Sequence, residues 1–299
     1  MALTINTNLS SMIVQSNLSK ATTSLNQAIE RMTTGFKINH ASDNAAGYSI
    51  ARNWEAKLGS LDVAADNAAT GADMLSTLED HYALVSTHVQ RVRDLTEQAA
   101  NGTYGSQSLK AIQSEITARL EEIDRIAANC EFNGQYMMDG SLKAGLAIQV
   151  GTDGTASKSQ IALAGTLFER GDVKALFEGD DASEVTDEAK KASRDAVAKK
   201  CAGLDNSTTA SGMLATIDTV INTISSRITT LGAAQNRIES AIESIGVQSE
   251  NITSSLSTLR DADVATESSN YIKAQILQQA SATLLATANQ TPSIALNLL

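Results

Sequence analysis

Apolar residues recur at alternating spacings of four and three over a long stretch near the C-terminal end of the sequence, from residue 217 to residue 259. A heptad repeat of this length predicts a supercoiling helix about 65 Å long, at 1.5 Å of rise per residue. Such a helix needs a partner along its whole apolar face. The residues that we assign to this seam are Ile217, Ile221, Ile224, Ile228, Leu231, Ile238, Ile242 and Ile245.

A second apolar pattern in the N-terminal half supplies candidate partners for that helix. Residues 58–92 again follow heptad spacing, with one three-residue step from Leu75 to Leu78 that resembles a stammer. The turn-rich segment 101–105 follows, and residues 109–126 then repeat the helical pattern. A short connection of this kind predicts antiparallel neighbours. We therefore expect a mainly α fold, with a long antiparallel coiled-coil bundle of two N-terminal helices and one C-terminal helix.

Between residues 132 and 165 the spacing changes from helical to alternating. Phe132-Asn133-Gly134 is a turn signal, and apolar residues alternate with polar or small ones at 146–150 and again at 161–163. This pattern predicts one or two β-hairpins, a small β region attached to the bundle.

The segment from about residue 169 to residue 200 is rich in charges of both signs. This composition predicts solvated surface with one short helix, and makes the segment the most expendable part of the chain. The domains that we expect are terminal helices at 1–40 and 262–299, a helical bundle with its hairpin at 41–165 and 207–261, and a short variable surface region at 166–206.

The two ends of the sequence lack charge. Residues 1–19 and 274–299 carry no charged side chain, and both mix aliphatic residues with Asn, Gln, Ser and Thr at helix-compatible spacing. Such segments bury poorly alone and suit packing against copies of themselves, so we expect assembly to order them. The alternative is that they are frayed tails. The aliphatic residues assigned to these terminal assembly helices are Leu9, Ile13, Leu18, Ile276, Leu277, Leu284 and Leu285.

Composition and charge exclude several classes of partner. Only 3% of the 299 residues are aromatic and a single proline is present, which favours long helices with aliphatic cores. The formal net charge of −11 disfavours nucleic acid and anionic membranes as partners. No apolar run reaches 18 residues, and the first basic residue is Lys20, so we expect neither a membrane span nor a conventional secretory signal.

The sequence offers little that could carry catalysis. His81 and His88 are seven residues apart, about 10 Å along a helix, which is too far for one metal ion without another ligand. Cys130 and Cys201 are too few and too distant for a disulfide framework or a thiolate zinc site, and are read as two unpaired thiols. A His-Glu-x-x-His motif, a phosphate loop and a nucleophile elbow are all missing. We therefore expect no catalytic residue, metal or cofactor, and a protein that is not an enzyme.

One constellation of side chains is defined by geometry. Arg91 and Leu95 are four apart on one helix, while Arg91 and Glu115 are each twelve residues from Thr103, near the centre of the turn. In an antiparallel pair, Glu115 should therefore lie level with Arg91. The simplest interpretation is a surface ion pair that contributes roughly 0 to 1 kcal/mol.

Five blocks of the sequence resemble the terminal signatures of bacterial flagellins. They are MALTINTN at 1–8, AIERMTTGFKIN at 28–39, ASDNAAG at 41–47, AQILQQA at 274–280 and ATANQ at 286–290. The resemblance covers roughly residues 1–150 and 215–299. Several matched blocks in the right order make it far more specific than a heptad repeat alone.

The resemblance implies a structural subunit of the extracellular flagellar filament, with paired terminal helices lining an inner tube around the export channel. It implies export by the flagellar type III route, and partners that include an export chaperone and the cap and junction proteins. The family's matching positions imply that Arg91, Leu95 and Glu115 serve both a subunit contact and the flagellin-sensing Toll-like receptor. With about forty residues between the β region and the last bundle helix, any outer domain must be small or absent.

Two other functions remain open at this point. A hook-filament junction protein of the same superfamily would share the terminal packing but form only a short ring. An intracellular coiled-coil scaffold would carry charged, soluble ends, and the uncharged termini count against it.

Overall fold

The computed structural model describes residues 8–179, 186–203 and 207–296 of the chain. It separates into two compact units, one of residues 1–59 with 249–299 and one of residues 60–248. The boundaries of these two units lie inside the long helices that span residues 45–100 and 207–260.

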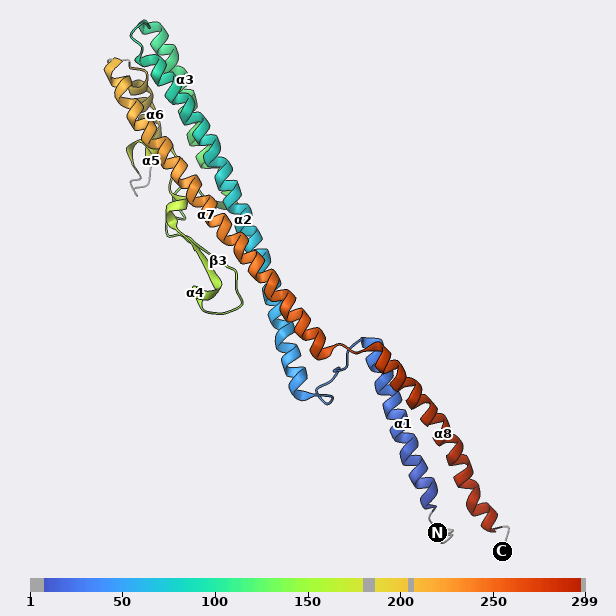
Figure 1. The fold of residues 1–299 in the computed structure, drawn as a ribbon. Coiled ribbons are helices and arrows are strands. Elements are labelled where there is room, and N and C mark those ends of the chain that lie inside the picture. Colours follow the sequence, from blue (N-terminus) through green and yellow to red (C-terminus); the bar gives the residue numbers. More distant parts are fainter. Residues whose placement is uncertain (1–7, 180–185, 204–206, 297–299) are drawn as a thin grey trace. The chain divides into compact units, whose positions relative to one another are not determined.

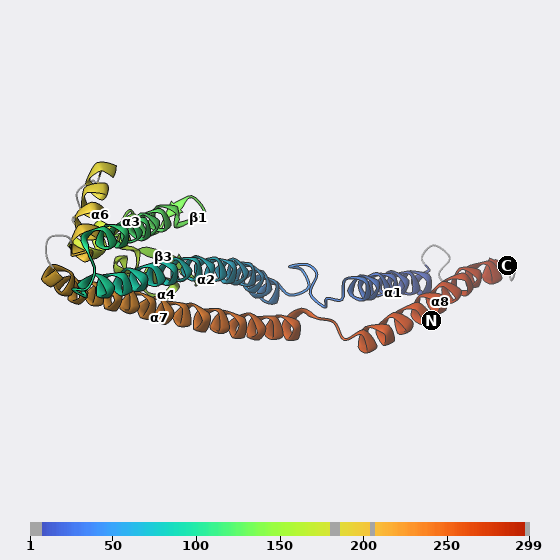
Figure 2. The same ribbon diagram turned by 90° about the horizontal axis from the view of Figure 1, so that it is seen from above.

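The unit of residues 60–248 is organised around three long helices. These are α2 (Ala45–Ala100), α3 (Ser106–Asn129) and α7 (Ser207–Arg260), which lie side by side in Figures 1 and 2. Arg93 Nε donates to Asp218 Oδ1 at 2.7 Å, and Gln235 Nε2 donates to Glu79 Oε2 at 2.9 Å. Residue numbers that rise on α2 as they fall on α7 make these helices antiparallel. The helical bundle expected from the sequence is confirmed.

The core of this unit runs along the apolar seam of α7. Ile217, Ile224, Leu231 and Ile238 are completely buried, and Ile245 is buried as well. Ile221, Ile228 and Ile242 are half-buried and pack against the same cluster. On α2 and α3, the facing residues are Leu75, Leu78, Tyr82, Val85, Val89, Val92, Ile116, Leu120 and Ile123.

Two short antiparallel hairpins confirm the expected β region. β1 (Glu131–Phe132) pairs with β2 (Gln135–Tyr136) through Asn133 and Gly134, whose φ values of 49° and 81° identify the left-handed turn that Asn-Gly favours. β3 (Leu146–Gln149) pairs with β4 (Gln160–Leu163). This second hairpin lies against α2, because a Cβ added to Gly71 would be only 2.3 Å from Ile148 Cδ1.

The charged region after β4 is not simply solvated surface. It contains α5 (Val173–Glu178) and α6 (Asp187–Cys201), beside the short helices α4 (Ala156–Ser159) and η1 (Gly165–Phe168). Arg194 Nη1 bonds Asp124 Oδ2 of α3 at 2.6 Å, and the Val173 amide donates to Asp124 Oδ1 at 2.8 Å. Our expectation of solvated surface is therefore wrong for part of this region. The residues that it buries in the core include Phe168, Val173, Val197, Ala198 and Cys201.

In the other unit, α1 (Leu9–Thr34) pairs with α8 (Val264–Leu296), as the two views of the ribbon show (Figures 1 and 2). The Asn8 side chain caps α1 by accepting from the Ser11 amide, and it donates to the Ala288 carbonyl at 2.7 Å. Near the other end of α1, Arg31 Nη1 lies 3.2 Å from Glu267 Oε1. These contacts make α1 and α8 antiparallel.

Candidate assembly interface

The helices α1 and α8 meet through small side chains. Ala21, Ala28 and Ala274 are buried between them, together with the hydroxyl-bearing Ser281. Because alanine fills little space, two helices can approach closely there without burying much apolar surface. The interface between α1 and α8 within one chain therefore buries little apolar surface.

The large aliphatic residues of the same two helices lie largely outside that interface. Leu18 and Leu285 are half-buried. The other five residues assigned to terminal assembly are exposed, and their exposed fractions are Leu9 63%, Ile13 54%, Ile276 59%, Leu277 49% and Leu284 56%. Covering one such side chain completely contributes roughly 1.5 to 3 kcal/mol. Within one chain, the helix pair thus leaves most of these aliphatic side chains uncovered.

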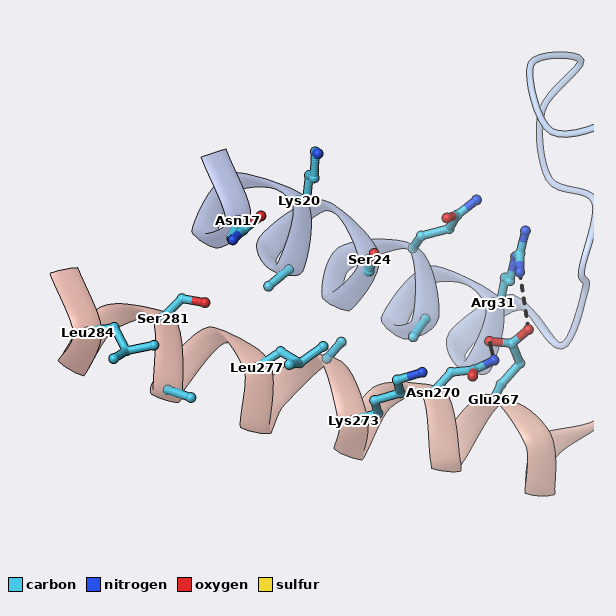
Figure 3. Close-up of a pocket in the computed structure, with 15 residues that line it drawn as sticks. Asn17, Lys20, Ser24, Arg31, Glu267, Asn270, Lys273, Leu277, Ser281 and Leu284 are labelled. Atoms are coloured by element: carbon cyan, nitrogen blue, oxygen red, sulfur yellow. Dashed lines mark hydrogen bonds and ion pairs between the residues drawn. The ribbon is translucent and has the colours of Figure 1, made fainter. Parts of the chain in front are cut away.

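A groove of about 690 Å³ runs between α1 and α8. Figure 3 shows Leu277, Ser281 and Leu284 along the α8 wall, with Arg31 and Glu267 joined at one end. Lys20 and Lys273 also line the groove, but most of its wall is uncharged. Glu267 is buried, and a buried carboxylate loses its contact with water. Its ion pair with Arg31 compensates for that loss.

The predicted pair on α2 and α3 is present. Arg91 Nε and Nη2 both donate to Glu115 Oε1, at 3.0 and 2.9 Å, and both side chains are exposed. Leu95 does not lie beside them on the surface: it is only 2% exposed and belongs to the bundle core. Its expected place as an exposed anchor is therefore wrong, and any surface contact here depends on Arg91 and Glu115.

The histidines occupy separate surroundings. His81 Nδ1 lies 2.7 Å from the Thr77 carbonyl, and His40 Nε2 lies 2.8 Å from Glu30 Oε1. Burial of the His88 ring lowers its pKa, and the nearby positive charge of Arg119 lowers it further. Within the part of the chain that the structure describes, no group of three or more His, Cys, Asp or Glu side chains could hold a metal ion.

Both cysteines are free thiols inside the bundle. Burial raises the pKa of Cys130 to about 12 and that of Cys201 to about 11. Since the thiolate is the reactive form, neither residue is poised for nucleophilic or redox chemistry at neutral pH.

Several polar contacts were not foreseen from the sequence. Arg227 Nη2 bonds Glu169 Oε2 at 2.6 Å and its Nη1 donates to the Arg170 carbonyl at 3.0 Å, while its guanidinium lies over the Tyr82 ring. Arg260 makes a comparable set of contacts at the end of α7. The partners of each arginine are distant in sequence, so no periodic pattern could have paired them.

Among residues 8–179, 186–203 and 207–296, no helix is both long enough and apolar enough to cross a membrane.

Comparison with known proteins identifies the family. A profile described as the bacterial flagellin N-terminal helical region matches residues 5–143, and one described as the bacterial flagellin C-terminal helical region matches residues 214–299. The sequence is 37% identical to a flagellin of Xenorhabdus nematophila over 323 residues, and 39% identical to a flagellin of Serratia marcescens over 352 residues. Both comparisons span the whole of each chain. The chain belongs to the bacterial flagellin family.

Flagellins are structural proteins, and this flagellin is a subunit that polymerises into the extracellular filament of the flagellum. The predicted function is thereby confirmed. The two profiles leave only residues 144–213 between them, which agrees with the short central region expected from the sequence.

A solved structure from Vibrio parahaemolyticus, described as a flagellar hook-associated protein, is similar in fold, with a TM-score of 0.57. The similarity covers 73% of this chain and 100% of that one, at 14% sequence identity. At so low an identity it supports the fold alone. Full-length identity to flagellins favours the filament subunit over a junction protein or an intracellular scaffold.

Proposed function

We propose that residues 1–40 and 262–299 assemble the filament by packing the α1 and α8 helices of neighbouring copies against one another. The observation that supports this is the division of side chains on the helix pair. Alanines are buried within one chain, whereas Leu9, Ile13 and Ile276 are exposed. Exposed aliphatic residues that gather on the two helices favour association with another apolar surface.

In this proposal the bundle of residues 41–165 and 207–261 forms the outer wall of the filament, and residues 166–206 add to its surface. The seam of α7 would stabilise each subunit rather than join subunits, since its isoleucines are buried within the chain. Assembly would therefore depend on the neutral ends and on the outer faces of α2 and α3.

Repolymerisation of the purified protein tests the proposal. Filaments are dissociated by heat or acid, returned to neutral conditions and imaged by electron microscopy. Tubes of uniform diameter are expected. A chain that stays monomeric and fully folded under all conditions would rule the proposal out.

We propose that the chain leaves the cell by the flagellar type III route, with help from an export chaperone, and adds to the filament beneath cap proteins and beyond junction proteins. The support is the match of both ends of the chain to the bacterial flagellin family. The test is secretion of the chain in a strain without the flagellar export gate. Undiminished secretion there would contradict the route.

We also propose that Arg91 and Glu115 form part of a surface that is read by the flagellin-sensing Toll-like receptor on the free subunit. The support is the resemblance together with the exposure of the pair, since an arginine fork beside a carboxylate is a common anchor at protein interfaces. Arg91→Ala should weaken receptor binding by roughly 1 kcal/mol or more. Arg125→Ala is the matched control, because Arg125 is exposed and pairs with Glu122 on α3 alone. Equal losses in the two variants would contradict this role.

A further inference from the structure

The two connections of the unit that holds α1 and α8 are joined to each other. One links α1 to α2 through residues 35–44, and the other links α7 to α8 through residues 261–263. The Lys37 amide donates to the Arg260 carbonyl at 2.7 Å, and the Ala262 amide donates to the Gly35 carbonyl at 2.8 Å. These bonds place Phe36 opposite Asp261 in an isolated antiparallel bridge.

The side chain of Arg260 contacts several groups around this bridge. Its guanidinium lies 4.1 Å from the centre of the Phe36 ring and forms an ion pair with Glu55, and its Nε donates to the Ile38 carbonyl at 3.4 Å. The Arg260 side chain is only 13% exposed. We call Phe36, Ile38, Glu55 and Arg260 the Arg260 clasp.

The clasp uses properties that belong to arginine. The planar guanidinium stacks on an aromatic face while its edge still donates hydrogen bonds, and it stays charged at every physiological pH. A cation in the last turn of α7 also interacts favourably with the negative end of that helix. Ile38 is buried, and a Cβ added to Gly47 would lie 2.9 Å from Ile38 Cδ1, so the backbone that Arg260 holds is itself closely packed.

The interface of α1 with α8 needs a contact that fixes the axial register of the two helices. Alanine contacts such as Ala21, Ala28 and Ala274 offer shallow knobs and holes, which specify the axial register of two helices poorly. The clasp lies where α1 ends and α8 begins, and the Arg31 to Glu267 ion pair lies next to it. No clasp residue lines the groove, so the clasp does not itself contact an occupant of the groove.

We propose that Arg260 is a positioning residue for assembly: the clasp sets the register of α8 against α1, and so arranges the exposed aliphatic residues that a neighbouring subunit must meet. This inference rests on the proposed assembly role of the helix pair. The Arg260 side chain thereby fixes the axial register of α8 against α1, which the neutral end segments do not specify by themselves.

The test compares Arg260→Met with Arg260→Lys in the full chain. Methionine keeps the apolar stem and removes the charge and the fork, whereas lysine keeps the charge. The matched control is Arg237→Met, which removes an exposed arginine from the same helix. Seeded elongation on filament fragments should be about tenfold slower for Arg260→Met, intermediate for Arg260→Lys and unchanged for Arg237→Met.

A second readout reports the register of α8 against α1 inside the filament, independently of the rate of elongation. Ser11 Oγ lies 2.8 Å from Asn289 Oδ1, at the end of the helix pair that is far from the clasp in sequence. Cysteines placed at these two positions should cross-link readily within one chain in assembled filaments of the otherwise unchanged protein, and several-fold less in filaments of the Arg260→Met variant. Thermal unfolding of the bundle should be the same in both.

The outcomes separate the inference from the proposed function. Undiminished cross-linking with Arg260→Met overturns the inference, and so does wild-type elongation by that variant even where cross-linking falls. If the unsubstituted chain and Arg237→Met both fail to elongate, the proposed function is wrong, and the clasp's role in assembly is wrong with it.

Discussion

Neighbouring side chains on α2 have opposite surroundings. Arg91 is exposed and pairs with Glu115, whereas Leu95, one turn further along, is buried in the core. Residues four apart on a helix are rotated by only about 40° from each other, so the edge of a buried stripe can fall between them. Spacing alone placed both residues on one face. Burial of Leu95 follows from its contact with the neighbouring helices, which spacing does not define.

Truncating these two residues should have very different effects on stability. Leu95→Ala leaves a cavity in a packed core and should lower the free energy of unfolding by about 2 to 5 kcal/mol. Arg91→Ala removes one exposed ion pair and should lower it by less than about 1 kcal/mol. Urea unfolding followed by circular dichroism gives both values. Equal losses would mean that Leu95 is not in the core.

The thiols give a second prediction at the scale of single residues. Because burial raises the pKa of Cys130 and Cys201, both stay protonated as the pH rises from 7 to 9, where an exposed thiol would ionise. Alkylation by iodoacetamide in that range should therefore be slow and depend little on pH in the folded chain. In denaturant it should become fast and rise steeply with pH.

Intact-mass spectrometry of the alkylated chain measures this directly. The denatured chain serves as the control, since it contains the same two thiols without burial. Rapid labelling of the folded chain at pH 8 would show that the interior opens far more often than the packing implies.

At the scale of elements, the charged segment after β4 differs most clearly from the structure that its sequence predicted. Its helix α6 has charges over most of its surface, yet Val197, Ala198 and Cys201 face the core. Asp124 of α3 holds this segment by accepting from both Arg194 and the Val173 amide. Desolvation raises the pKa of Asp124, which reflects how far its carboxylate is withdrawn from water. A few buried contacts therefore decide the place of a mostly polar helix.

Placing a charge on the buried face of α6 tests this arrangement. Val197→Asp should lower the free energy of unfolding by about 3 kcal/mol or more, because an unpaired carboxylate is forced into an apolar contact. Lys191→Asp, on the exposed face of the same helix, is the control and should change stability by less than about 1 kcal/mol. Thermal unfolding of both variants measures the difference. If the two behave alike, α6 is as expendable as its composition suggested.

The elements that the sequence predicted well share one property, which is regular spacing. The α7 seam, the helices on either side of the turn at 101–105 and the Asn133-Gly134 hairpin all follow from local periodicity or turn chemistry. The Arg91 to Glu115 pair follows from the same antiparallel geometry. What could not be predicted depends on single long-range contacts, such as Asp124 with Arg194 and Arg260 with Phe36. No period connects such partners, and only the folded chain brings them together.

At the scale of the whole molecule, the chain separates stability from assembly. The bundle buries long aliphatic residues within one chain, while the terminal helices bury alanines and expose most of their leucines and isoleucines. A free subunit can therefore fold its bundle without completing its terminal contacts. The net charge of −11 lies entirely between the neutral end segments, where it does not oppose their close packing.

Removing either neutral end should therefore abolish polymerisation while the bundle stays folded. Deleting residues 1–19 removes Leu9 and Ile13 from α1, and deleting residues 280–299 removes Leu284 and Leu285 from α8. Each deletion also removes one side of the Asn8 to Ala288 contact. The helix left without its partner loses the packing of its buried alanines, and most helical stability in proteins comes from such tertiary packing. Light scattering should show no growth on filament seeds, while circular dichroism should still show the cooperative unfolding of the bundle.

Ile228→Asp is the opposite control, because it introduces a carboxylate into the seam and should damage the bundle with both ends intact. Normal filaments from either truncated chain would contradict the separation of roles.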